Sequence, residues 1–196
     1  MTTNFYHSGQ RNLQSRFGSQ ALADRLADVT HRTVLTDDDR AFIESRDLFF
    51  LATSDADGRP DCSFKGGQAG FVKAPAPDLI VWPDYDGNGM FRSLGNIAVN
   101  PQVGLLFIAF SGKPRRLRVN GRAEVVFDDA LMAAFPGAQM LVRLKPEHVF
   151  PNCPRYIPDL EHGVPSPYIP KPGELPVEPA WKNSNAFRDV VPPRKA

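Results

Sequence analysis

Apolar residues at helical spacing mark the first part of the chain. Between residues 19 and 31 they recur every three or four positions, which predicts a helix with Ser19 as its cap. Thr36 is followed three residues later by Asp39, the spacing of a capping box, and the acidic residues after Thr36 suit the positive end of a helix dipole. A second helix is therefore predicted to begin after Thr36 and to end near Arg46.

From residue 47 onward, the pattern changes to short apolar runs separated by turn-forming residues, which is typical of strands. The first two runs enclose the turn sequence Asp-Ala-Asp-Gly at 55–58 and predict a hairpin. Strands are predicted over 48–53, 61–65, 79–82, 103–110, 115–127 and 140–150, with a brief extended piece at 71–73 and short helices over 90–99 and 128–135. The strands do not alternate regularly with helices, which argues against a doubly wound parallel sheet.

The order of these elements predicts a mainly β fold of the α+β class. We expect six strands to form a small antiparallel β-barrel, either closed or split, with short flanking helices. Closure of the barrel would remove the edges that such strands otherwise expose. Eleven of the 19 prolines fall in the last 46 residues, where they exclude long helices and central strands. The expected organisation is an N-terminal arm and helix (1–36), a barrel domain (37–157) and a proline-rich C-terminal extension (158–196).

Charge and cysteine content narrow the function classes. Lys and Arg together number 23 against 22 Asp and Glu, so the strongly basic signature of a general nucleic-acid binder is missing and any anion binding must be local. Two cysteines are too few for a disulfide scaffold and fit a reducing compartment. Residues 1–16 lack the apolar core of a signal peptide, and the longest apolar run, 103–110, is too short to span a bilayer. We expect a cytoplasmic protein with no nucleic-acid or membrane partner.

A glycine-rich loop is the most informative candidate site. Gly87-Asn-Gly89 leaves a predicted buried strand and enters the helix at 90–99, whose first-turn amides can bind phosphate. Arg92, Ser93 and Asn96 add a charge and hydrogen-bond donors near that turn. A surface turn before a capped helix is the alternative for a lone Gly-Asn-Gly. The dinucleotide fingerprint is absent, because the third glycine and the βαβ context are missing.

Two predicted strands place polar side chains on one face. Arg116 and Arg118 alternate with apolar residues, so that two guanidinium groups share a face and could bind an anion; a solvated sheet face is the alternative. Ser63 and Lys65 likewise share a face. The lysine there either lies beside an electron-rich ring or extends to water.

Other common chemistries lack support in the sequence. The four histidines do not have metal-ligand spacing, and no further thiol or imidazole completes a zinc pattern with His148 and Cys153. Neither a nucleophile elbow nor a P-loop is present, so hydrolase and nucleotide triphosphatase activities are not indicated. Both cysteines are more typical of buried small hydrophobes than of catalytic thiols. No metal site and no catalytic side chain is predicted.

Taken in order along residues 37–157, eight short segments resemble one known family. They are Leu48-Phe-Phe-Leu-Ala-Thr-Ser, Asp57-Gly-Arg-Pro, Gly70-Phe-Val, Leu79-Ile-Val-Trp-Pro-Asp, Gly87-Asn, Ser93-Leu-Gly-Asn-Ile, Asn100-Pro-Gln-Val-Gly-Leu-Leu-Phe and Leu117-Arg-Val-Asn-Gly-Arg-Ala. The ordered set resembles the pyridoxamine 5′-phosphate oxidase-like family of flavin-binding split barrels. The resemblance implies a homodimer that holds FMN at the subunit interface.

Carried over position by position, the resemblance implies a set of cofactor-binding residues. One strand would flank the flavin ring, the glycine loop and the helix after it would bind the phosphate, and one arginine would approach the ring from the partner chain. In chain order the set is Ser63, Lys65, Trp82, Pro83, Asn88, Gly89, Met90, Arg92, Ser93, Asn96, Arg116, Arg118 and Arg155, the last being the residue from the partner. A cation such as Lys65 near the flavin N1 and C2 carbonyl would stabilise the reduced ring.

The chain also departs from the family pattern. It has Asp61-Cys-Ser-Phe-Lys65 where authentic pyridoxamine phosphate oxidases carry Arg-x-Val-Leu-Leu-Lys, and a lone Arg92 where they carry an Arg-Lys pair. Their C-terminal arginine and histidine motif has no match at 190–196. These departures argue against oxidation of vitamin B6 more strongly than against FMN binding.

The expected function is an FMN-dependent oxidoreductase that transfers a hydride or an electron pair between the flavin N5 and an unidentified small organic substrate, with no side chain required as acid or base. Alternatives on the same barrel are a deazaflavin-dependent reductase, a non-catalytic flavin- or haem-binding module, and a plain dimerisation domain. The proline-rich extension is expected to pack across the dimer as a strap over the flavin.

Overall fold

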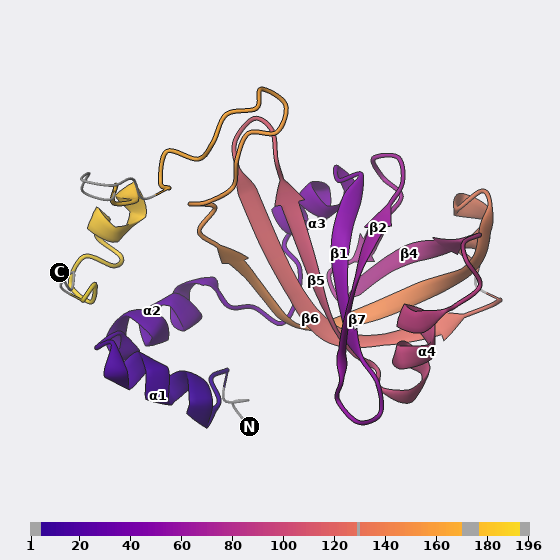
Figure 1. Ribbon diagram of the computed structural model, residues 1–196, viewed down its shortest axis with the longest axis horizontal. Helices are drawn as coiled ribbons and strands as arrows, with labels where there is room; N and C mark the ends of the chain where they lie inside the picture. Colours follow the sequence, from indigo (N-terminus) through magenta and orange to yellow (C-terminus); the bar gives the residue numbers. More distant parts are fainter. Residues whose placement is uncertain (1–4, 129, 170–176, 193–196) are drawn as a thin grey trace.

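The computed structural model describes residues 5–128, 130–169 and 177–192, and a single antiparallel sheet forms its body (Figure 1). The strands follow the order β2-β1-β5-β6-β7-β4-β3, and every neighbouring pair is antiparallel. Their bounds are β1 (Leu48–Ser54), β2 (Pro60–Gly66), β3 (Lys73–Ala76), β4 (Leu79–Tyr85), β5 (Gln102–Ala109), β6 (Arg115–Val126) and β7 (Ala138–Asn152). The α+β class and the antiparallel sheet of a split barrel are confirmed.

The predicted number of strands is wrong, because the described sheet has seven. The additional strand is β3, which pairs with β4 at the edge of the sheet although it contains Pro75. Proline is tolerated there because an edge strand need not donate every backbone N–H to a neighbour. The other edge is β2, and β2 does not pair with β3, so the sheet is open and the closed form of the two alternatives is excluded.

The two longest strands, β6 and β7, are antiparallel neighbours whose backbones come very close at one irregularity. The register between β6 and β7 shifts between Asn120 and Gly121. A Cβ atom placed on Gly121 would lie 2.1 Å from the carbonyl oxygen of Lys145, so a side chain at this position cannot be accommodated without moving backbone. Glycine at such an irregularity marks a close approach of two backbones. We infer that this contact fixes the curvature that gives the sheet its inner face.

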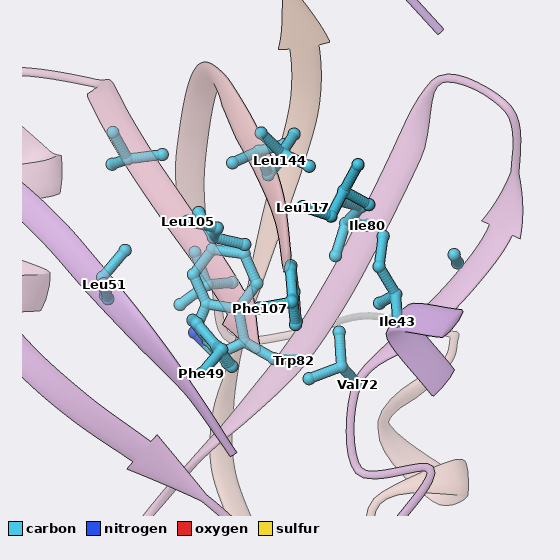
Figure 2. Packing of buried hydrophobic residues seen from close by; sticks show 14 of the residues in the cluster. Ile43, Phe49, Leu51, Val72, Ile80, Trp82, Leu105, Phe107, Leu117 and Leu144 are labelled. Atoms are coloured by element: carbon cyan, nitrogen blue, oxygen red, sulfur yellow. The ribbon is translucent and has the colours of Figure 1, made fainter. Parts of the chain in front are cut away.

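The inner face holds the hydrophobic core (Figure 2). Burial alternates along β5, as the period of a half-buried strand requires. At the centre, the ring of Phe49 lies 5.5 Å from that of Trp82 and 5.2 Å from that of Phe107. Ile43, from the helix at one end of the sheet, is fully buried in the same cluster. Edge-on and tilted aromatic packing of this kind holds the strands in register and makes the inner face of the sheet rigid.

Four α-helices lie around the sheet within the described ranges. They are α1 (Ser8–Arg16), α2 (Gln20–Thr30), α3 (Asp37–Glu44) and α4 (Arg92–Val99), and two short 3-10 helices follow at η1 (Met132–Ala134) and η2 (Ala180–Asn183). The predicted helices at α2, α3 and α4 are confirmed, with α4 beginning two residues late. The helix predicted over 128–135 is reduced to η1, and residue 129 lies outside the described residues. None of these helices is both long and apolar enough to cross a membrane.

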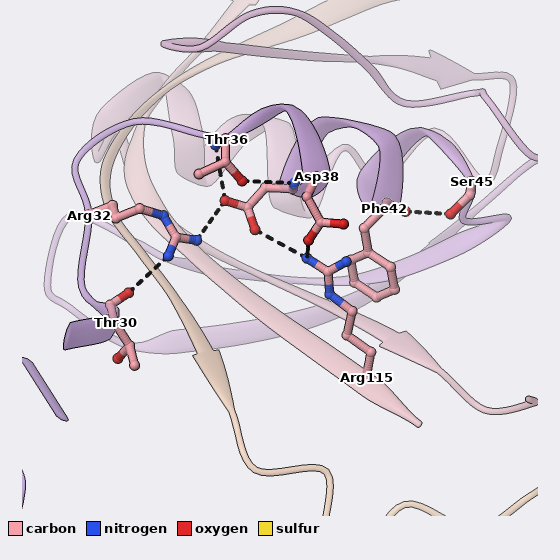
Figure 3. A network of polar contacts seen from close by, with 8 residues as sticks. Thr30, Arg32, Thr36, Asp38, Phe42, Ser45 and Arg115 are labelled. Atoms are coloured by element: carbon pink, nitrogen blue, oxygen red, sulfur yellow. Dashed lines mark hydrogen bonds and ion pairs between the residues drawn. The ribbon is translucent and has the colours of Figure 1, made fainter. Parts of the chain in front are cut away.

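A buried carboxylate joins α3 to the rest of the fold (Figure 3). Asp39 Oδ2 accepts hydrogen bonds from the backbone of Thr36 at 3.1 Å and from Arg32 Nη2 at 2.6 Å, and Oδ1 accepts one from Arg115 Nη2 at 3.2 Å. Thr36 in turn accepts from the Asp39 backbone, so the predicted capping box is confirmed. The Arg115 guanidinium also lies over the Phe42 ring, 4.2 Å from its centroid. Through hydrogen bonds to the Asp39 carboxylate, this cluster links the segment after α2, the start of α3 and the start of β6.

The two terminal segments pack on each other beside the sheet (Figure 1). Arg25 in α2 donates a hydrogen bond to the carbonyl of Ala186 at 2.8 Å and pairs with Asp189 at 3.2 Å. An isolated bridge between Arg32 and Val149 joins the end of this region to β7. In the described part, the C-terminal extension therefore contacts its own chain. Residues 170–176 and 193–196 of the predicted strap lie outside the described residues, and its packing across a dimer stays a prediction.

Candidate functional site

A pocket of about 380 Å³ opens between β2, the end of β4 and the start of α4. This volume is in the range of small-molecule sites. We call it the α4 pocket. Seven of the predicted cofactor-binding residues line it: Ser63, Lys65, Asn88, Gly89, Met90, Arg92 and Ser93. The structure thus brings together the glycine loop and the β2 strand, which are more than 20 residues apart in sequence.

Strand register explains how β2 contributes to the pocket. Lys65 is paired with Phe49 and Ser63 with Leu51, so the polar side chains of β2 lie on the same face of the sheet as the core residues of β1. Because β2 is an edge strand of an open sheet, this inner face is accessible there. On the opposite face, Phe64 is 60% exposed.

The loop into α4 has an unusual backbone. Asn88 Oδ1 accepts a hydrogen bond from the amide of Met90 at 3.0 Å, and Gly89 has a φ of +70°. Phe91, at the helix start, has a φ of +48° and is the one non-glycine residue with positive φ among those described. Such a conformation costs on the order of 1–3 kcal/mol and is concentrated at functional sites. No side chain caps α4, so its first-turn amides are left for another partner, and the buried Ser93 lies among them.

Two acidic residues that the sequence interpretation missed balance the charge of the pocket. Lys65 Nζ lies 3.7 Å from Asp84 Oδ1, and Arg92 Nε lies 3.5 Å from Asp61 Oδ1. The charges of these two cations and two carboxylates sum to zero. Strand alternation could have placed Asp61 beside Ser63 and Lys65, but the pairing of Asp84 with Lys65 depends on how β4 lies relative to β2 and leaves no signal in the sequence.

Three other predicted residues support the pocket without lining it. Trp82 is 1% exposed and packs edge-on against Phe49 in the core, and Pro83 is buried beside it. Asn96 Nδ2 donates a hydrogen bond to Thr53 Oγ1 at 3.0 Å and so fixes α4 to β1. Direct contact of these residues with a cofactor stays a prediction.

The three remaining predicted residues lie elsewhere in the chain. Arg116 and Arg118 do share a face of β6, but they line a different cavity of about 810 Å³, between β6, β7, α2 and η2. We call it the strap cavity. Arg116 Nη2 donates to the carbonyl of Cys153 at 2.7 Å, and Arg155, after β7, lies 5.7 Å from the centroid of the Tyr156 ring. One chain therefore does not bring these arginines to its own α4 pocket, and their delivery by a partner subunit stays a prediction.

The sequence of the region that forms the α4 pocket identifies the protein family of this chain. The model of pyridoxamine 5′-phosphate oxidase matches residues 35–153, which include all seven strands, α3 and α4. The chain belongs to the pyridoxamine 5′-phosphate oxidase family. Homodimers are typical of this family. The match contains the whole α4 pocket, whereas α1, α2 and the C-terminal extension lie outside it.

Comparison with curated proteins and with solved structures gives the following similarities. No curated protein matches the chain. HupZ of Group A Streptococcus is 17% identical, with 67% of this chain and 98% of HupZ covered and a TM-score of 0.49. HutZ, the heme storage protein from Vibrio cholerae, is 26% identical over 55% of this chain and 86% of HutZ, with a TM-score of 0.41. The FAD binding protein from Mycobacterium smegmatis is 16% identical over 61% and 97%, with a TM-score of 0.43.

A histidine pair near the strap cavity should make stability depend on pH. His31 Nε2 lies 2.8 Å from His148 Nδ1, so one of the two rings must offer an unprotonated nitrogen. Burial, His148 and Arg32 lower the pKa of His31 below its usual 6.5. The folded state therefore binds fewer protons than the unfolded state. The stability that this pair contributes is present above pH 6.5 and is lost as the pH falls from 6.5 through the lower folded-state pKa.

Urea unfolding of the natural chain and of His31→Gln at pH about 7.5 and about 5.5 checks this expectation. The natural chain should lose more stability on acidification than the variant, because glutamine does not titrate. Equal losses in the two proteins would show that the pair does not contribute to the pH dependence.

Proposed function

We propose that the protein is an FMN-dependent oxidoreductase acting on a small organic substrate, with the flavin held at the α4 pocket. The observation that carries the proposal is the meeting, in one pocket, of an uncapped helix start, a buried serine, an arginine and an inward-facing lysine. Membership of the pyridoxamine 5′-phosphate oxidase family supports the same conclusion.

The donors at the start of α4 fit a phosphate group. Amides of an uncapped helix start and the Ser93 hydroxyl supply neutral donors, and the helix dipole favours an anion there. Arg92 is 65% exposed in its pair with Asp61. Because an exposed ion pair is worth only about 0.2–1 kcal/mol, Arg92 can exchange that carboxylate for a phosphate at little cost.

The other end of the pocket fits the flavin ring. Lys65 is held on the inner face with 21% of its side chain exposed, and Asp84 keeps its ammonium group in place. When bound, FMN supplies transfer of a hydride or an electron pair at N5. A fixed cation at Lys65 favours the negatively charged, reduced ring, so its role is electrostatic. We propose no side chain of the pocket as a proton donor or acceptor for the reaction.

We include a homodimer in the proposal, with the cofactor at the subunit interface. The outer face of β1 and β2 carries Phe64, which is 60% exposed and lies 6.3 Å from the Phe50 ring. An aromatic pair with one exposed and one half-buried ring on a sheet face is suited to contact with a second copy. Under this proposal, Arg155 reaches the flavin from the partner chain.

Visible absorption of the purified protein followed by FMN titration tests the proposal. We expect a flavin spectrum, and we expect Arg92→Gln to weaken FMN binding about tenfold or more, because hydrogen bonds to charged groups are worth about 1.5–3 kcal/mol. Arg59→Gln, an exposed arginine in the turn between β1 and β2, is the matched control and should leave the affinity unchanged. A colourless protein that takes up no FMN, or a Soret band in its place, would refute the proposal.

A second variant tests the charge balance of the pocket with the opposite sign. Asp61→Asn releases Arg92 and removes a negative charge from the phosphate end, so FMN should bind about two- to fivefold more tightly. Asp57→Asn, in the exposed turn outside the pocket, should not change the affinity. Weaker binding by Asp61→Asn would place the phosphate away from the start of α4.

A further inference from the structure

The strap cavity is a second concave site, and it lies outside the α4 pocket. Its volume of about 810 Å³ is large enough for a small organic ligand. The floor is the outer face of β6 and β7, and the walls come from the N-terminal part of the chain and from the segment around η2. Both walls lie outside the region that matches the family model. The cavity is therefore a feature of this chain's own terminal segments.

The floor of the cavity carries uncompensated positive charge. Arg116 and Arg118 both line it, and none of the described residues that line it is acidic. Burial, together with the charge of Arg118, lowers the pKa of Arg116, and the opposing contribution comes from Cys153 rather than from a carboxylate. Planar guanidinium forks match the geometry of a carboxylate or a related anion.

Two orphaned atoms specify the ligand further. Arg116 Nε and Asn152 Oδ1 are buried without a hydrogen-bond partner, and the two residues are directly paired across β6 and β7 on the cavity floor. Both atoms are enclosed in the cavity floor, so a ligand reaches them only when the side chains of Arg116 and Asn152 rotate toward it. An unsatisfied buried polar atom costs about 1–3 kcal/mol, so a ligand that satisfies both gains affinity. Arg116 Nε–H requires an acceptor, and Asn152 Oδ1 requires an N–H or O–H donor.

The walls are aromatic and are held in place. Phe5 in the N-terminal wall and the edge-to-face pair of Trp181 and Phe187 in the opposite wall, whose centroids are 5.4 Å apart, line the cavity. Trp181 Nε1 donates to Cys153 Sγ at 3.4 Å, which attaches η2 to the end of β7. Aromatic walls with a charged floor favour a flat ligand that carries its charge at one end.

We propose that the strap cavity binds a planar aromatic anion that also carries a hydroxyl or amino donor. The anion contacts Arg116 and Arg118, the donor contacts Asn152, and the ring lies between the aromatic walls. This site is independent of the FMN site in the α4 pocket, so the proposal gives Arg116 and Arg118 this role in place of the cofactor-binding role that the family resemblance implies.

Calorimetric titration of the full chain with 6-hydroxy-2-naphthoate tests the proposal. We expect saturable one-to-one binding. The uncharged 6-hydroxy-2-naphthamide should bind at least tenfold more weakly, and 2-naphthoate, which lacks the donor, should also bind more weakly. No detectable binding of the hydroxynaphthoate, or equal binding of the carboxylate and the amide, would overturn the proposal.

Variants separate this site from the α4 pocket. Arg118→Gln should lower the affinity for 6-hydroxy-2-naphthoate at least tenfold, and because Arg118 is exposed its replacement should not disturb folding, which a thermal melt verifies. Arg116→Gln should act in the same direction. Arg92→Gln is the matched control and should bind the naphthoate normally. Normal binding of the naphthoate by Arg118→Gln would overturn the proposal. So would a loss of FMN affinity in Arg118→Gln as large as that in Arg92→Gln, because the two sites would then not be independent. Failure of FMN to bind the natural chain would count only against the proposed function.

Discussion

Replacing Asp39 by alanine should lower the free energy of unfolding by about 3–5 kcal/mol, the cost of breaking a buried ion pair on one side. Asp39 is 2% exposed, and its carboxylate accepts hydrogen bonds from Arg32, Arg115 and the backbone of Thr36. The substitution leaves two guanidinium groups without their buried partner and removes half of the capping box of α3. Both losses act on the point where three segments of the chain meet.

The neighbouring acid provides a matched control for this experiment. Asp38 also pairs with Arg115, at 2.9 Å, but it is 82% exposed, so Asp38→Ala should cost less than about 1 kcal/mol. Urea unfolding of both variants and of the natural chain measures the difference. Similar losses for Asp38→Ala and Asp39→Ala would contradict the assignment of the stabilisation to the buried carboxylate.

Replacing Gly121 by alanine should destabilise the sheet by about 3 kcal/mol, at the upper end of the usual cost of overpacking. The new methyl group would lie 2.1 Å from the Lys145 carbonyl oxygen, and backbone atoms on both strands must move to admit it. Because the register shift between β6 and β7 lies at this residue, the movement would also alter the curvature of the sheet.

Replacing a second glycine, Gly95, by alanine should have the opposite effect on the free energy of unfolding. Gly95 lies inside α4, and a Cβ atom there meets nothing within 4 Å. Gly95→Ala should therefore stabilise the protein by up to about 1 kcal/mol through helix propensity alone. Thermal and urea unfolding distinguish the two variants. A Gly121→Ala protein as stable as Gly95→Ala would show that the crossing of β6 and β7 is more adaptable than the structure indicates.

Local patterns were sufficient for most of the fold. Alternating burial in β5 and the capping box at Thr36 follow from interactions within a few residues, so the sequence alone could predict them. The strand β3 was underestimated because Pro75 normally interrupts a strand, and only its edge position makes it acceptable. The helix α1 was missed because Leu13 is its one apolar side chain, so its sequence shows no apolar stripe.

The candidate site was predictable to a smaller extent. The glycine loop and the polar face of β2 are visible in the sequence, and the family resemblance placed them at one cofactor. The charge pairing of Lys65 with Asp84 depends on the approach of two strands that are not hydrogen-bonded neighbours. The strap cavity depends on contacts between the two ends of the chain, such as Arg25 with Ala186, and no local pattern reports contacts of that range.

The contact between Arg25 and Ala186 also has a consequence for biosynthesis. The two residues are separated by 161 positions, so α2 leaves the ribosome about 10–30 s before its partner, at a synthesis rate of about 5–20 residues per second. All seven strands precede Ala186 in the chain, and the barrel can form during that interval. The outer face of β6 and β7, with its two arginines, then lacks its η2 wall in the nascent protein until the segment around η2 has been synthesised.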